Sequence, residues 1–179
     1  MASAVYTIDP THSSAHFSVR HMMITNVKGE FTKVAGTVTF DRDNPGASKV
    51  DVTIDARSLH TRDEQRDGHL KSADFLDVEK YPEIKFVSKS VQPDGHEEYL
   101  VKGDLTIHGV THEVDLHVEG PTAEVKDPWG NTKAGAAATA RINRKDFGLT
   151  WNATLETGGV LVGEEVKINL EVELTRSAS

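Results

Sequence analysis

The sequence of 179 residues contains no cysteine. This absence excludes disulfide scaffolds, thiolate zinc sites, iron–sulfur clusters and cysteine nucleophiles. The chain also lacks a run of basic residues, and its 20 Lys and Arg against 28 Asp and Glu give a formal net charge of −8. Without a segregated basic patch, such a chain is expected to repel phosphate backbones and anionic lipid surfaces. We therefore expect no nucleic-acid partner.

Long apolar runs are missing as well. No uninterrupted apolar stretch approaches membrane-spanning length, so no integral membrane segment is expected. The first residues lack the basic region and apolar core of a secretion signal, which predicts a cytoplasmic location. Low-complexity tracts and linkers are absent, and this length suits one sizeable core, so residues 1–179 are predicted to form a single domain.

The residues that are present favour a sheet protein. Val, Ile and Thr occur in short stretches separated by Gly, Pro, Asn and Asp. Apolar and polar residues alternate along 13–21 and, most clearly, along 165–174. The same period, or a similar composition, marks residues 6–8, 34–40, 50–54, 84–91, 101–107, 114–118 and 134–142. These segments predict about eight or nine strands, a number that commonly closes into a ligand-sized barrel. Turn residues between neighbouring segments favour a meander.

One segment, residues 59–81, departs from the strand pattern. Thr61 and Glu64 have capping-box spacing, and Leu70 and Leu76 recur at helical intervals before Pro82. The pattern predicts a short helical excursion that lies across one end or one side of the barrel.

Nine histidines raise the question of a metal site. His112 and His117 are five residues apart, which on a strand places them on opposite faces, so hydrogen-bonded or solvated histidines are favoured and no metal ligand is predicted. His21 continues the apolar face of Val19, and His112 continues that of Val114. Each is either a polar anchor for a ligand head group or a core residue with a hydrogen-bond partner.

The stretch from residue 134 to 142 places four alanines on the face that carries Ile142. Small side chains in line on an inward face leave volume unfilled, which indicates a ligand cavity. The alternative is close packing of this face against the 59–81 segment. The sequence favours neither, and it contains no G-x-S-x-G nucleophile motif that would indicate a catalytic residue.

Long blocks of the chain resemble the YceI family of lipocalin-like, polyisoprenoid-binding proteins. They read YTIDPTHSSAHFSVRHMMITNVKGEF, DGHLKSADFLDVEKYPEIKF, VKGDLTIHGVTHEV, INRKDFGL and GEEVKINLEVEL. The resemblance implies an all-β fold, an antiparallel eight-stranded lipocalin-like barrel with short helices between strands. It also implies an apolar pore that holds a long isoprenoid or similar amphiphile, without catalytic activity.

We therefore expect non-enzymatic binding, storage or transport of a long-chain amphiphilic lipid, such as a polyisoprenoid or a quinone-like molecule, with no other cofactor. A second copy of the chain, forming a homodimer, is left open as a partner. The alternatives are an enzyme that acts on a lipid-like substrate in the same barrel, with a histidine-bound metal, and a structural protein with a filled barrel. The expected ligand-binding residues are Phe17, Val19, His21, Val38, Phe40, Val52, Ile54, Leu70, Phe75, Phe86, Leu105, Ile107, His112, Val114, Leu116, Ala136, Ala138 and Ile168.

Overall fold

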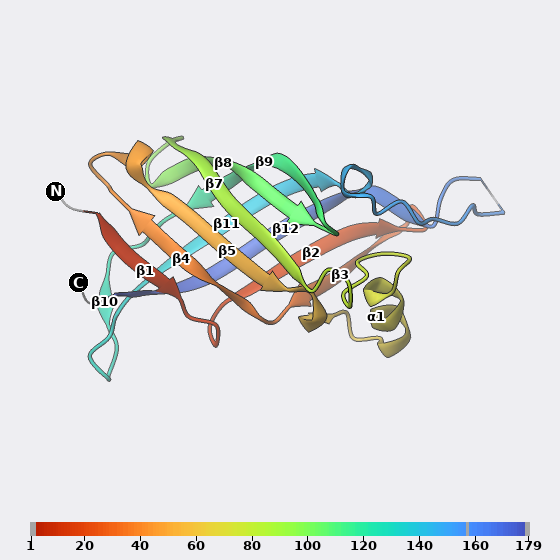
Figure 1. The fold of residues 1–179 in the computed structure, drawn as a ribbon, viewed down its shortest axis with the longest axis horizontal. Coiled ribbons are helices and arrows are strands. Elements are labelled where there is room, and N and C mark those ends of the chain that lie inside the picture. The colour runs from red at the N-terminus through yellow and green to blue at the C-terminus, as the bar shows by residue number, and fades with distance from the viewer. Residues whose placement is uncertain (1–2, 157, 178–179) are drawn as a thin grey trace.

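The computed structural model describes residues 3–156 and 158–177 and consists mostly of antiparallel strands (Figure 1). The strands are β1 (Ala4–Ile8), β2 (Ser14–His21), β3 (Thr25–Phe31), β4 (Val34–Phe40), β5 (Lys49–Asp55), β6 (Leu59–His60), β7 (Glu83–Pro93), β8 (Glu98–Ile107), β9 (Val110–Glu119), β10 (Val125–Lys126), β11 (Thr132–Asn143) and β12 (Val162–Arg176). The helices are α1 (Glu64–Lys71) and the short 3₁₀ turns η1 (Pro45–Ala47), η2 (Ala56–Ser58) and η3 (Arg144–Phe147).

The strands form a closed eight-stranded antiparallel barrel, as the sequence predicts. The barrel wall has eight positions around its axis, here called staves, and three of them are each formed by two successive strands. These are β1 with β2, β3 with β4, and β5 with β6, because the two strands of each pair run in the same direction along the same neighbouring stave. The other staves are β7, β8, β9, β11 and β12. Each stave pairs with the next along the chain, which confirms the meander, and the last pairs with the first.

The predicted helical excursion is shorter than expected. Only α1 is helical, and its N-cap is Asp63, whose carboxylate accepts a hydrogen bond from the Arg66 backbone N–H at 3.1 Å. The prediction that Thr61 begins the helix is wrong: Thr61 donates its hydroxyl to Asp67 instead. None of the α1 residues is fully buried. The helix therefore lacks a buried apolar face whose packing would stabilise further turns toward Leu76.

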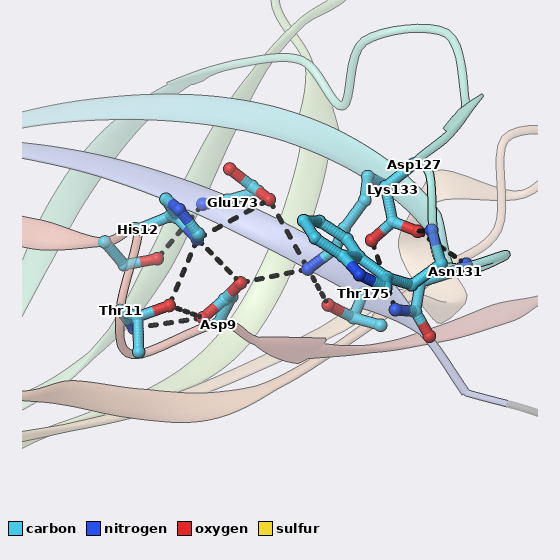
Figure 2. Close-up of polar contacts among 10 residues, drawn as sticks. Asp9, Thr11, His12, Asp127, Asn131, Lys133, Glu173 and Thr175 are labelled. Atoms are coloured by element: carbon cyan, nitrogen blue, oxygen red, sulfur yellow. Dashed lines mark hydrogen bonds and ion pairs between the residues drawn. The ribbon is translucent and has the colours of Figure 1, made fainter.

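Polar side chains reinforce the place where the barrel closes. Asp9, His12, Lys133 and Glu173, here called the closure cluster, join the break between β1 and β2 to β11 and β12 (Figure 2). The Lys133 ammonium lies 2.9 Å from Asp9 and 3.4 Å from Glu173, and it also donates to the Thr175 hydroxyl at 2.8 Å. The Lys133 and Asp9 side chains are each only 15% exposed, so solvent screens this pair less than an ordinary surface pair.

The closure cluster shifts two pKa values in opposite directions. Hydrogen bonds from His12, Lys133 and Thr11 hold the pKa of the Asp9 carboxyl well below its usual range. The hydrogen bond to Asp9 and the charge of Glu173 raise the pKa of His12. The His12 imidazole lies 3.0 Å from Asp9. Asp9 therefore stabilises the fold when ionised and His12 when protonated.

This arrangement predicts that the combined contribution of Asp9 and His12 to stability is greatest between the ordinary pKa values of the two groups, 3.8 for Asp9 and 6.5 for His12. Below that window the Asp9 contribution is lost as the carboxyl protonates, and above it the His12 contribution is lost as the imidazole deprotonates. Urea unfolding as a function of pH measures both limits. In His12→Gln the loss of stability on the alkaline side should disappear, while the loss on the acid side persists. If the alkaline loss is unchanged in this variant, a group other than His12 causes it.

Candidate functional site

The barrel encloses a cavity of about 510 Å³ near α1, here called the main cavity. Its wall is built from residues of all eight staves, together with α1, the segment that follows it and η3. Apolar and polar residues alternate along the strands, and every second side chain points into the barrel, so the apolar residues form this wall. The volume lies within the range of small-molecule pockets.

A glycine shapes one part of the wall. Gly29 on β3 pairs with Phe17 on β2, and a Cβ at position 29 would overlap the Phe17 ring. The absence of a side chain therefore lets the ring lie against the opposite strand. Phe17 also approaches Phe31, with ring centroids 5.6 Å apart, so this corner of the main cavity is aromatic.

The main cavity opens to solvent between β2 and α1. Arg20, Asp63 and Gln65 line the cavity and are exposed, whereas all its other lining residues are buried or half-buried. These three residues define the mouth. His21 is half-buried on the wall beside Arg20, the position from which a side chain could reach a ligand head group.

Three rings on the wall of the main cavity pack in edge-to-face and tilted arrangements. His69 of α1, Phe75 and Trp151 approach one another with centroid distances of 4.6 to 5.3 Å. Phe75 is among the residues predicted from the sequence, whereas Trp151 is not, because Trp151 follows η3 in an irregular segment that has no strand or helix periodicity. Their convergence places a tryptophan on the cavity wall.

Arg144 of η3 is a second wall residue that the sequence analysis missed. It is 3% exposed, and its guanidinium donates to the carbonyl oxygens of Gly163, Leu149 and Trp151 at 2.7 to 2.9 Å and to that of Val162 at 3.2 Å. Burial lowers the pKa of Arg144, although an arginine stays charged in proteins. Arg144 thus anchors the segment between η3 and β12 over the main cavity.

A second cavity of about 80 Å³ is lined by residues such as Ile8 of β1, Val38 of β4 and Leu174 of β12, and we call it the distal cavity. Val52, Leu116 and Leu170 line both cavities and therefore stand between them. Ala136 and Ala138 line the distal cavity, whereas Ala140 and Ile142 line the main one. The alanine face points inward, as predicted.

The alternative of an alanine face closely packed on residues 59–81 is wrong. Leu70 and Phe75 from this segment line the main cavity together with Ala140, so empty volume separates them from the alanine strand. The distal volume beside Ala138 is small because Phe40 and Tyr99 enter it, with their rings 5.4 Å apart. The unfilled volume expected from the alanines therefore lies mainly beside Ala140.

A third hollow, of about 640 Å³, lies on the outside of the barrel where β9 and β11 separate after three paired positions. Charged and polar side chains such as Asp115, Arg141 and Lys167 line it, which makes it a poor match for an apolar chain. His112 lines this outer hollow and not the main cavity. The expectation that its imidazole points into the pore is wrong, because the ring is exposed and packs on Phe147 at 5.3 Å.

The other predicted residues divide between the two inner cavities. Those on the wall of the main cavity are Phe17, Val19, His21, Val52, Ile54, Leu70, Phe75, Phe86, Leu105, Ile107, Val114, Leu116 and Ile168. Those on the wall of the distal cavity alone are Val38, Phe40, Ala136 and Ala138. Contact of any of them with a ligand stays a prediction.

Comparison with known proteins agrees with this geometry. The model of the YceI-like domain matches residues 6–174. The chain belongs to the YceI-like family. It is 38% identical over 172 residues to the UPF0312 protein SAS2572 of Staphylococcus aureus, covering 96% of this chain and 98% of the relative.

Two solved structures share the YceI-like fold of this chain. Burkholderia cenocepacia BcnA superposes with a TM-score of 0.78 at 24% identity, covering 93% of this chain and 98% of that one. A polyisoprenoid binding domain from Saccharophagus degradans, implicated in plant cell wall breakdown, superposes with a TM-score of 0.67 at 15% identity, covering 97% and 99%. Within the residues described for the present chain, no helix is long and apolar enough to cross a membrane.

Because Arg144 anchors this segment, its removal should destabilise the protein more than removal of Arg141, an exposed arginine on the neighbouring strand β11. Arg144→Met leaves buried carbonyl groups without a donor, and we expect a loss of about 3 kcal/mol in the free energy of unfolding. Arg141→Met removes an exposed ion pair with Glu165 and should cost less than about 0.5 kcal/mol. Urea denaturation measures both; equal losses would show that the four carbonyl contacts contribute little.

Proposed function

We propose that this YceI-like barrel binds a long-chain amphiphilic lipid in its main cavity and stores or carries it without chemical change. The observation that supports the proposal is a cavity of about 510 Å³ whose wall is mainly apolar and whose exposed polar side chains lie at the mouth. A ligand with an apolar tail and a polar head matches this distribution. The polyisoprenoid-binding function of the Saccharophagus degradans domain agrees with it.

Burial is the proposed source of affinity. Each CH₂ removed from water contributes about 0.8 kcal/mol, so roughly two methylenes raise affinity tenfold. A wall of aliphatic and aromatic side chains provides little directional recognition, and we therefore expect affinity to rise with chain length and to respond weakly to salt. Arg20 and His21 at the mouth are the residues proposed to contact the head group.

The enzymatic alternative has less support from the geometry. His16 and His69 line the main cavity, but His16 lies 2.8 Å from the Ser14 hydroxyl and His69 lies 3.0 Å from Asp74. Within the part of the chain that the structure describes, the group able to bind a metal ion is Asp9, His12 and Glu173. The Lys133 ammonium already provides a cation there, outside the main cavity.

The location of the protein in the cell and the identity of its lipid need tests of their own. We keep a cytoplasmic location as a proposal, which fractionation of the producing cells tests directly. The identity of the lipid is tested by mass spectrometry of organic extracts of the purified protein, and an isoprenoid or quinone-like molecule is expected.

A ring placed in the main cavity should block the ligand. Ala140 points into this cavity, so Ala140→Phe should fold with near-normal stability, because the ring fills empty volume, and should lose binding of geranylgeraniol. Thr139→Phe places the same ring on the outer face of β11 and should bind normally. Trp151 fluorescence in a Trp129→Phe background reports the ligand, since Trp129 is 83% exposed and away from the cavity. Undiminished binding by Ala140→Phe would contradict the proposed site.

The side chains between the two cavities should set the preferred chain length. Leu116→Ala joins the distal cavity to the main one at a stability cost of about 2 to 5 kcal/mol. We expect this variant to favour geranylgeraniol over farnesol more strongly than the wild type does, because the longer tail can enter the added volume. Titration of both alcohols gives the ratio of affinities. Leu105→Ala enlarges the main cavity alone and is the control. An equal change in the ratio of affinities in this control would show that the added volume, and not its position between the two cavities, causes the effect.

A further inference from the structure

The turn between β2 and β3 presents apolar side chains to solvent. Met22, Met23 and Ile24 are 41%, 61% and 68% exposed, and Val160 from the neighbouring loop is 40% exposed. A hydrogen bond of 2.7 Å from the Met22 N–H to the Leu161 carbonyl oxygen joins the turn to that loop. We call these four residues the apolar tip. They make up half of the large exposed apolar residues in the described part of the chain.

The backbone of the turn is strained where it carries the methionines. Met22 and Met23 have φ angles of 52° and 61°, and the Ile24 N–H donates to the His21 carbonyl oxygen at 3.0 Å. Turns with two consecutive positive φ angles favour Asn-Gly, because other side chains clash with the backbone there. The sequence thus has two bulky apolar residues at positions where small polar ones would be more stable. Folding alone does not account for this choice.

The apolar tip adjoins the mouth of the main cavity. Arg20 lines the mouth, and its guanidinium donates to the Met23 carbonyl oxygen at 3.4 Å. His21, Leu161 and other wall residues flank the tip in sequence. In Figure 1 the β2–β3 turn and the 158–161 loop lie at the same end of the barrel, away from the chain termini. A surface that contacts the tip would therefore be next to the opening.

The charge near the tip differs from that of the whole chain. Residues 10–29 contain Arg20 and Lys28 but no Asp or Glu, and residues 158–163 contain no charged side chain, although the formal net charge of the chain is −8. Acidic residues that flank this region are Asp63 at the mouth and Glu156 and Glu164 on either side of the loop. No carboxylate of the described residues lies within ion-pair distance of Arg20 or Lys28. Apolar side chains beside unpaired cations complement the surface of an anionic lipid bilayer, where tails lie beneath phosphate head groups.

We propose that the apolar tip docks on an anionic lipid bilayer and places the mouth of the main cavity against it, so that a lipid can pass between membrane and barrel. This inference rests on the proposed lipid-binding function. Insertion is shallow: the methionines, Ile24 and Val160 enter the head-group region, and Arg20 and Lys28 face the phosphates. The barrel itself stays in water.

The test measures co-sedimentation of the full chain with vesicles made of equal parts of phosphatidylcholine and phosphatidylglycerol. The wild type should bind these vesicles, and should bind pure phosphatidylcholine vesicles or high-salt samples less well. The double substitution Met22→Asn and Met23→Gly should weaken binding at least about tenfold. Its Tm should rise, because the turn then has its preferred residues. Ile24→Ser, which alters no strained position, should weaken vesicle binding without changing the Tm appreciably.

Measurements of ligand uptake separate this inference from the proposed function. The double variant should take up geranylgeraniol from solution as the wild type does, since Met22 and Met23 are not on the cavity wall. Ala140→Phe should lose the ligand yet bind vesicles normally. If the wild type binds geranylgeraniol but no vesicles, docking is wrong and the carrier proposal stands; if it takes up no ligand, the carrier proposal fails.

Two further outcomes would overturn the docking proposal. Vesicle binding that is lost in Ala140→Phe and kept in the double variant would show that association follows from lipid uptake. If the apolar tip is instead a contact between two copies of the chain, sedimentation velocity without vesicles would show a dimer for the wild type and a monomer for the double variant. The docking proposal expects the same oligomeric state for both proteins.

Discussion

The pairing of β12 with the first stave is the constraint on which the remaining structure depends. Along one edge β12 pairs with β11 over eleven positions, and along the other it pairs first with β2 and then with β1. This double pairing turns an open sheet into a barrel and leaves the apolar faces of the staves around one lumen. The closure cluster reinforces the junction with a half-buried ammonium between two carboxylates. Without the junction, the main cavity would be an open apolar surface.

Most of the fold could be predicted from the sequence because strand periodicity is local. The alternation along 13–21 and 165–174 corresponds to β2 and β12, and Ala134, Ala136, Ala138 and Ala140 lie inward on β11 as expected. The helical excursion was less predictable. Thr61 and Asp63 both have side chains suited to a cap, and the tertiary hydrogen bond from Thr61 to Asp67 decides between them.

The site could be predicted only in part, because its volume depends on contacts between distant segments. Ala138 and Ala140 have the same residue type, face and strand, yet Phe40 and Tyr99 fill the space beside one and not beside the other. His112 has the same position in the strand alternation as the inward residues Val114 and Leu116. However, β9 pairs with β11 only at residues 117–119 and has separated from it at His112. Arg144 and Trp151 gain their positions from carbonyl groups and rings that no sequence period indicates.

The position of the two chain ends has a practical consequence. Tyr6 on β1 pairs with Arg176 on β12, and both ends lie on the side of the barrel opposite α1 (Figure 1). Because neighbouring ends can be joined by a short linker, the chain is suited to circular permutation, with new ends in an exposed hairpin loop such as that between β7 and β8. A fluorescent protein or surface anchor fused before β1 or after β12 would likewise lie on the side of the barrel opposite α1. The barrel could therefore be immobilised or converted into a sensor while its opening stays accessible.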